Sequence, residues 1–166
     1  MTAEYTEADF DCLSWHDCSI HGFELLTGDA DHDDWTNDFV LDIDFIAVWS
    51  CGVDGGARFG VAPATLTFHN VTDLQVRIDW SVSGCQVAMH PPGIGNIERE
   101  EVVDHQLRLD RPYYAWTVRL NWPDGGVIRF GAVGFTQRLR AEPVEMASQY
   151  LSSAQRRLQV GGDRRR

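Results

Sequence analysis

Two carboxylates stand at strand-like spacing and could carry chemistry. Asp42 and Asp44 alternate with apolar residues in LDIDFIAVW, so their side chains project from one side of an extended chain, about 6 to 7 Å apart. Paired carboxylates at such a distance can serve as acid and base or hold a cation. They can also face solvent or pair with arginines across a polar sheet face. We favour the second interpretation, because charged strand faces are usually solvated.

Two arginines form the second notable pair. The alternation in residues 113–135 predicts a hairpin closed by Pro-Asp-Gly, with Arg119 directly opposite Arg129. Like charges across a strand pair repel each other, so the pattern indicates a compensating anion. We therefore expect an anion or carboxylate clamp, in which either Asp42 or Asp44 or a bound anionic ligand faces the two arginines.

An acidic stretch, residues 27–38, carries five Asp, and its composition predicts an exposed loop. It resembles the opening of an EF-hand, but Asp34 stands where that loop needs Gly and Val40 where it needs Glu. A protein-contact surface is the alternative to a merely solubilising loop, because an exposed Trp often anchors interfaces. The partner-binding residues that we predict are Asp29, Asp31, Asp33, Asp34 and Trp35.

The cysteines and nearby histidines offer the residue types of a metal site. Cys12, His16, Cys18 and His21 could bind zinc, yet their spacing is not that of paired knuckles and an extended chain would not bring them to one side. We expect no metal and no cofactor. The four cysteines, which include Cys51 and Cys85, are expected to be thiols of a reducing compartment.

The charge distribution limits the classes of partner. The net charge is −11, and fourteen of the twenty-five acids precede Arg58, the first basic residue. Nucleic acid binding requires clustered cations, so this balance argues against it and favours a basic protein partner. The sequence has neither a long apolar run nor a leader pattern, which predicts a cytoplasmic protein that does not enter membranes. All fourteen basic residues are Arg, which suggests a GC-rich bacterial genome.

The remaining pattern predicts a mostly β fold. Residues 59–80 are expected to form the central hairpin, with Phe68 opposite Leu74, and residues 39–49 a further strand. Together with the other alternating segments this gives a strongly curved antiparallel sheet, or partly closed barrel, of about seven strands. Residues 1–166 are expected to be a single domain, with a polar lead-in over 1–11, one C-terminal helix over 143–159 and a frayed tail over 160–166.

The segments WHDCSIHGF, LDIDFIAVW and VAPATLTFHNVTDLQVRIDW resemble a family of small bacterial β-rich proteins of unassigned function that open with a Trp-His-Asp motif. The resemblance covers most of the chain before residue 143, and its motifs are structural. In its acidic, β-rich character the chain is also similar to bacterial immunity proteins, which neutralise the toxins of neighbouring cells.

Catalytic signatures such as a nucleophile elbow or a phosphate loop do not occur in the sequence. We therefore expect a non-enzymatic binding protein, possessing an acidic surface for a basic partner and similar to immunity proteins. The alternative is a small hydrolase or isomerase that uses Asp42, Asp44 and a histidine such as His69 in a pocket of the sheet. The sequence does not determine the oligomeric state.

Overall fold

The computed structural model describes residues 3–80, 90–103 and 111–160, and these form one antiparallel sheet of ten strands. The fold is therefore mostly β, as predicted, but with ten strands rather than about seven. The strands are β1 (Glu4–Thr6), β2 (Ser19–Thr27), β3 (Asn37–Cys51), β4 (Ala57–His69), β5 (Thr72–Arg77), β6 (Gly93–Glu101), β7 (Tyr114–Trp122), β8 (Val127–Ala132), β9 (Gly134–Leu139) and β10 (Val144–Met146). The helical segments are η1 (Glu7–Cys12), η2 (Ala30–His32) and α1 (Ser153–Val160).

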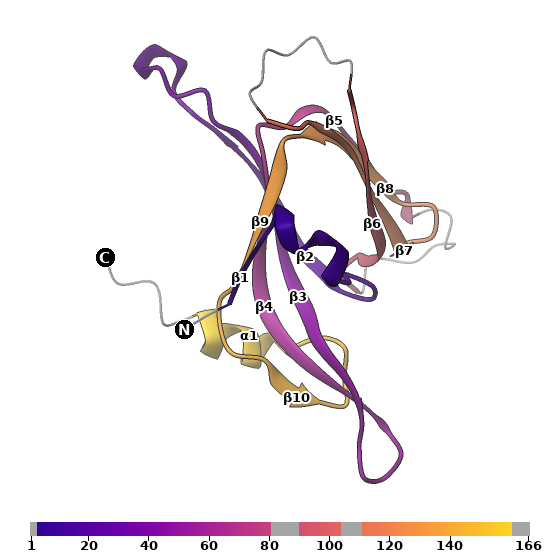
Figure 1. Cartoon of the computed structure of the whole chain (residues 1–166). Coiled ribbons are helices and arrows are strands. Elements are labelled where there is room, and N and C mark those ends of the chain that lie inside the picture. The colour runs from indigo at the N-terminus through magenta and orange to yellow at the C-terminus, as the bar shows by residue number, and fades with distance from the viewer. Residues whose placement is uncertain (1–2, 81–89, 104–110, 161–166) are drawn as a thin grey trace.

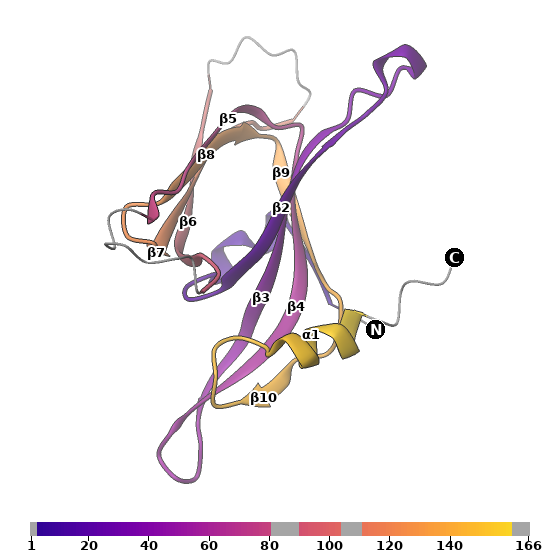
Figure 2. The same ribbon diagram turned by 180° about the vertical axis from the view of Figure 1, so that it is seen from behind.

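The sheet curves into two facing walls without closing. Its strand order is β1-β9-β4-β3-β2-β6-β7-β8-β5, with β10 added to the lower part of β4. Figures 1 and 2 show β9, β4, β3 and β2 as one wall and β6, β7, β8 and β5 as the other. The walls are joined weakly on the β2 side, where the ladder to β6 contains only Ser19 opposite Gly93.

Two corners carry the chain from one wall to the other. Between β4 and β5 the backbone turns at Asn70, which has φ 53°, and between β8 and β9 it turns at Gly134, which has φ 156°. Asn and Gly are the residues that tolerate positive φ most readily. The predicted hairpin over residues 59–80 is therefore wrong: β4 pairs with β3, β9 and β10, whereas β5 pairs with β8.

The core lies between the two walls and is rich in aromatic rings. Phe68 of β4 lies in its centre, with ring centroids 5.1 Å from Trp116 and 4.6 Å from Phe130. The inward side chains of β3 are fully buried, because the alternation in this strand places one set of residues toward the opposite wall. These side chains are Phe39, Leu41, Ile43 and Phe45.

The second predicted hairpin exists as β7 and β8, but its register differs by two residues. Arg119 pairs with Val127, and Arg129 pairs with Thr117, so the two arginines are diagonal neighbours rather than directly opposite. Trp122 remains in the ladder with β6, where it lies opposite Gly93, and the turn into β8 is widened accordingly. The amide of Leu120 donates to the carbonyl of Gly126 at the last rung.

Both ends of the chain differ from the prediction. The lead-in is structured: β1 pairs with β9, and η1 carries Phe10 against the rings of Trp15 and Trp116. Arg99 covers Phe10 at 4.1 Å from the ring centroid and forms an ion pair with Glu7.

The C-terminal helix is shorter than the predicted 143–159. Val144–Met146 forms strand β10, which pairs with β4, and α1 begins only at Ser153. Val144 is therefore part of a strand and not of the predicted helix. Residues 161–166 of the predicted tail lie outside the described part of the chain. No helix in that described part is long and apolar enough to span a bilayer.

Candidate functional site

One surface feature is a projecting arm, which we define as residues 27–37 of the β2–β3 hairpin, beyond the part of β3 that pairs with β4. Figure 1 shows this hairpin running past the body of the sheet, with η2 at its tip. Strand pairing continues to the rung between Thr27 and Asn37, and the amide of Gly28 donates to the carbonyl of Thr36. Regular pairing up to this last rung makes the arm a defined hairpin rather than a loose loop.

Side-chain hydrogen bonds fix the acidic tip of the arm. Asp29 accepts from the amide of Asp31 at 3.1 Å, and Asp34 accepts from the amide and the hydroxyl of Thr36 at 3.0 and 2.6 Å. These two bonds from Thr36 lower the pKa of Asp34 below its ordinary value of 3.8, because they stabilise the carboxylate. The hydrogen bonds therefore hold Asp34 as a carboxylate and fix its position in the tip.

An exposed tryptophan accompanies these carboxylates. Trp35 is 72% exposed, and its indole Nε1 donates to Asp33 at 2.9 Å. The hydrogen bond holds the ring beside the acids while its apolar surface faces solvent. Such an arrangement is typical of a side chain that anchors an interface.

Apolar side chains continue from the tip along β2. Phe23 is 55% and Leu25 is 50% exposed, although both face the same side of the sheet as the buried residues of β3. They are uncovered because β2 pairs with β6 only at Ser19, and in the described part of the chain no strand pairs with its outer edge beyond that residue. The acidic tip of the arm is thus continuous with the exposed apolar residues and the open strand edge of β2.

Asp42 and Asp44 lie on the opposite side of β3 and serve the fold. Arg156 of α1 donates to both carboxylates, and Arg140 donates to Asp42. Asp44, which is fully buried, also accepts from the amide of Leu151 at 2.9 Å. The two aspartates therefore hold the C-terminal segment against the sheet, and they do not meet Arg119 or Arg129 as the clamp prediction supposed.

A histidine completes the environment of Asp44. His21 Nε2 lies 2.9 Å from the Asp44 carboxylate. Burial by itself raises the pKa of Asp44, but the hydrogen bonds from His21 and Leu151 and the charge of Arg156 outweigh burial and leave the pKa below its ordinary value of 3.8. The carboxylate is ionised and fully partnered, so it is not available as a general base.

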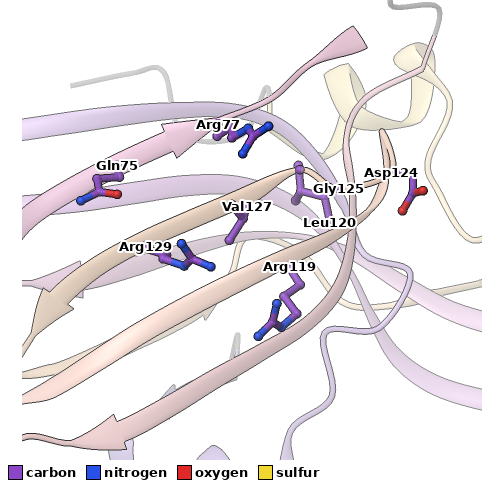
Figure 3. Close-up of a pocket in the computed structure, with 9 residues that line it drawn as sticks. Gln75, Arg77, Arg119, Leu120, Asp124, Gly125, Val127 and Arg129 are labelled. Carbon is purple, nitrogen blue, oxygen red and sulfur yellow. The ribbon is translucent and has the colours of Figure 1, made fainter. Parts of the chain in front are cut away.

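Arg119 and Arg129 lie on the outer face of the other wall. With Arg77 of β5 they line an open hollow of about 500 Å³, which Figure 3 shows around Val127. Arg119 forms an ion pair with Glu98 at 3.2 Å, whereas Arg77 and Arg129 form no ion pair with any described residue. The predicted pair thus belongs to a group of three arginines.

His69 belongs to a polar chain that crosses three strands. Its Nδ1 lies 3.0 Å from Asp38, and its Nε2 lies 3.0 Å from the hydroxyl of Thr136. Asp38 also accepts from the amide of Asn70, at the corner where β4 turns into β5. Because each member has a partner and the carboxylate binds the corner backbone, we assign this chain to the structure of the corner.

The Trp-His-Asp segment is also structural. Trp15 is buried, and its Nε1 donates to the buried Gln137 at 2.7 Å. Asp17, at φ 64°, accepts from Asn121 and Gln149 at 2.6 and 2.9 Å. The segment therefore connects the N-terminal region to both walls.

Cysteine chemistry and metal binding find little support in the described residues. Cys12, Cys18 and Cys51 are free thiols, and Cys85 lies outside the described residues. Burial raises the pKa of Cys18 to about 12, which keeps this thiol protonated and unreactive. No group of three His, Cys, Asp or Glu side chains arranged to hold a metal ion occurs among the residues that the structure describes.

No protein-family model, no curated protein and no solved structure matches this chain. Any assignment of function therefore depends on the geometry given above.

Proposed function

We propose that the protein is a binding domain, similar in role to immunity proteins, that presents the acidic arm to a basic partner protein. The proposal assigns recognition to the tip carboxylates and Trp35, and it assigns the rest of the sheet to holding the arm in place. Charge attraction would guide the partner to the tip, and the apolar side chains along β2 would then be covered.

The exposed apolar surface of the arm and of the adjoining β2 edge carries this proposal. The core side chains of β3 and β4 are almost completely buried, so the fold has the means to cover apolar groups. Trp35 of the arm nevertheless remains 72% exposed, and Phe23 and Leu25 are at least half exposed on the β2 edge that leads to the arm. Exposed apolar groups that gather in one region, rimmed by charge, are typical of an interaction site.

Neutralising the tip should weaken the complex without weakening the fold. An Asp-to-Asn change keeps one acceptor oxygen and replaces the other with an NH2 group. Asp33 and Asp34 each use a single oxygen in these bonds and keep an acceptor, whereas Asp29 uses both of its oxygens. Four surface charge pairs at about 0.5 kcal/mol each amount to about 2 kcal/mol, a loss in affinity of roughly 30-fold. The test is capture of the partner from the native cell, or by co-expression with the product of the adjacent gene. The variant carries Asp29→Asn, Asp31→Asn, Asp33→Asn and Asp34→Asn.

A matched control has the same net charge as the test variant but an intact tip. It changes four exposed acids outside the arm: Asp11→Asn, Glu100→Gln, Glu101→Gln and Glu145→Gln. We expect the control to retain the partner, and wild-type binding to weaken as salt is raised. Retention of the partner by the tip variant, at the affinity of the control, would show that the acidic tip is not the contact surface.

A further inference from the structure

The outer face of the β5-β8-β7 wall gathers arginines in a protein whose net charge is −11. Pairing places them in two neighbouring rows across the wall. Val127 lies between Arg77 and Arg119 in the first row, and Arg129 lies between Gln75 and Thr117 in the second. The alternation of β8 points Val127 and Arg129 outward, since Ile128 between them is fully buried.

The three arginines surround one position. Neighbouring strands are about 4.8 Å apart, so the backbones of Arg77 and Arg119 are about 10 Å apart, with the side chain of Val127 between them. Arg129 lies one row further along, which gives a triangle of guanidinium groups above Val127. Figure 3 shows the three side chains on three adjacent strands, beside the turn that carries Asp124.

Folding alone does not account for this gathering of charge. Asp42 and Asp44, the expected compensating acids, are held by Arg140 and Arg156 on the other wall. Asp124 lines the hollow and Glu98 pairs with Arg119, so the three arginines and these two carboxylates leave one net positive charge. Like charges on neighbouring strands repel each other, which makes a bound anion favourable.

We propose that this hollow is a binding site for a phosphate group. Guanidinium groups bind phosphate through paired N–H donors, and a phosphate carries up to two charges on oxygens that can each meet a different arginine. A carboxylate offers one charge and two oxygens, and so satisfies three arginines less well. The site is independent of the acidic arm, which lies on the other wall (Figure 1).

Titration of the whole chain with inorganic phosphate, followed by backbone amide chemical shifts, tests this site. Phenyl phosphate is titrated in parallel to distinguish a free ion from a phosphate ester, and sodium acetate and sodium chloride are added at matched ionic strength. We expect saturable shifts in β5, β7 and β8 with one or both phosphates. Tighter binding of inorganic phosphate would indicate a free ion as the ligand, and tighter binding of phenyl phosphate would indicate a phosphate ester. Acetate and chloride should produce no saturable shift.

Two variants and one control decide whether the arginines bind the ion. Arg129→Gln and, separately, Arg77→Gln should each weaken phosphate binding about tenfold or more, since each removes a charged hydrogen-bond donor. Arg138→Gln removes an exposed arginine that pairs with Glu4 on the other wall, and should leave binding unchanged. Shifts that do not saturate, equal binding of acetate, or unchanged phosphate binding in both test variants would overturn the proposal. The shifts of residues far from the hollow report in the same spectra that each variant is folded.

Discussion

Replacing Asp44 by Asn is expected to destabilise the protein by about 3 to 5 kcal/mol at pH 7, the range found when one partner of a buried charge pair is removed. The substitution leaves Arg156 without its buried carboxylate and weakens the acceptor for the Leu151 amide. The attachment of Leu151 and α1 to β3 should then depend on Asp42 alone, while β10 stays paired with β4. Urea unfolding at pH 7 measures the change in the free energy of unfolding.

The stabilisation that Asp44 contributes should depend on pH. The folded pKa of Asp44 is below 3.8, so its contribution is fully present above about pH 4 and is lost as the pH falls through the folded value. The difference in stability between wild type and Asp44→Asn should therefore shrink as the pH falls below 4. A difference that stays constant from pH 7 to pH 3 would show that the ionised carboxylate does not support the fold. Asp124→Asn is a suitable control, because Asp124 is an exposed carboxylate in the turn before β8.

Replacing Phe68 by Ala is the second change for which we expect a large effect. Phe68 is 1% exposed and contacts the rings of Trp116 and Phe130 on the opposite wall and of Phe135 on the neighbouring strand β9. Loss of the ring leaves a cavity between the two walls, and such changes cost about 3 to 5 kcal/mol. Thermal and urea unfolding of the variant measure this loss.

Val76→Ala distinguishes the predicted β4–β5 hairpin from the observed pairing, because the two predict different losses of stability. In such a hairpin Val76 would share the buried face with Phe68, and truncating it would destabilise the core. In the structure Val76 lies on β5 beside β8 and is 40% exposed, so we expect a loss below about 1 kcal/mol. A loss as large as that of Phe68→Ala would favour the hairpin that the structure rejects.

Alternation predicted which side chains of a strand are buried, but not which strand is its neighbour. Phe39, Leu41 and Ile43 alternate with the other residues of the predicted strand over 39–49, and they are fully buried. The pattern continues equally well through residues 59–80, where a corner at Asn70 sends the next strand to the opposite wall. Alternation of apolar and polar residues does not reveal such a corner, because each strand has one buried face whether the chain forms a hairpin or crosses to the opposite wall.

A bulge within β3 also separates the observed buried face from the one that alternation predicts. Strict alternation would place Trp49 on the same face as Phe39 and Phe45, but the register shifts between Ile46 and Val48, and Trp49 is half exposed. A bulge adds one residue and reverses the faces beyond it. In LDIDFIAVW this residue is Ala47, which has no feature that marks it in the sequence.

The candidate sites also differ in whether their residues are close together in the sequence. The acidic arm is local in sequence, and composition alone placed its exposed loop. The partners of Asp42 and Asp44 come from Arg140 and Arg156, about a hundred residues away, and Arg77 joins Arg119 and Arg129 only through the pairing of β5 with β8. Seven of the fourteen Arg follow residue 137, but nothing in their spacing links them to the carboxylates of β3.

Shortening the arm tests the proposed function most directly. Thr27 and Asn37 are directly opposite each other, so residues 28–36 can be replaced by Asn-Gly, the sequence of a two-residue hairpin turn. The account predicts that this variant melts within a few degrees of the wild type but no longer captures the partner that the wild type binds. Capture of that partner by the shortened chain, at wild-type affinity, would contradict the assignment of recognition to the arm.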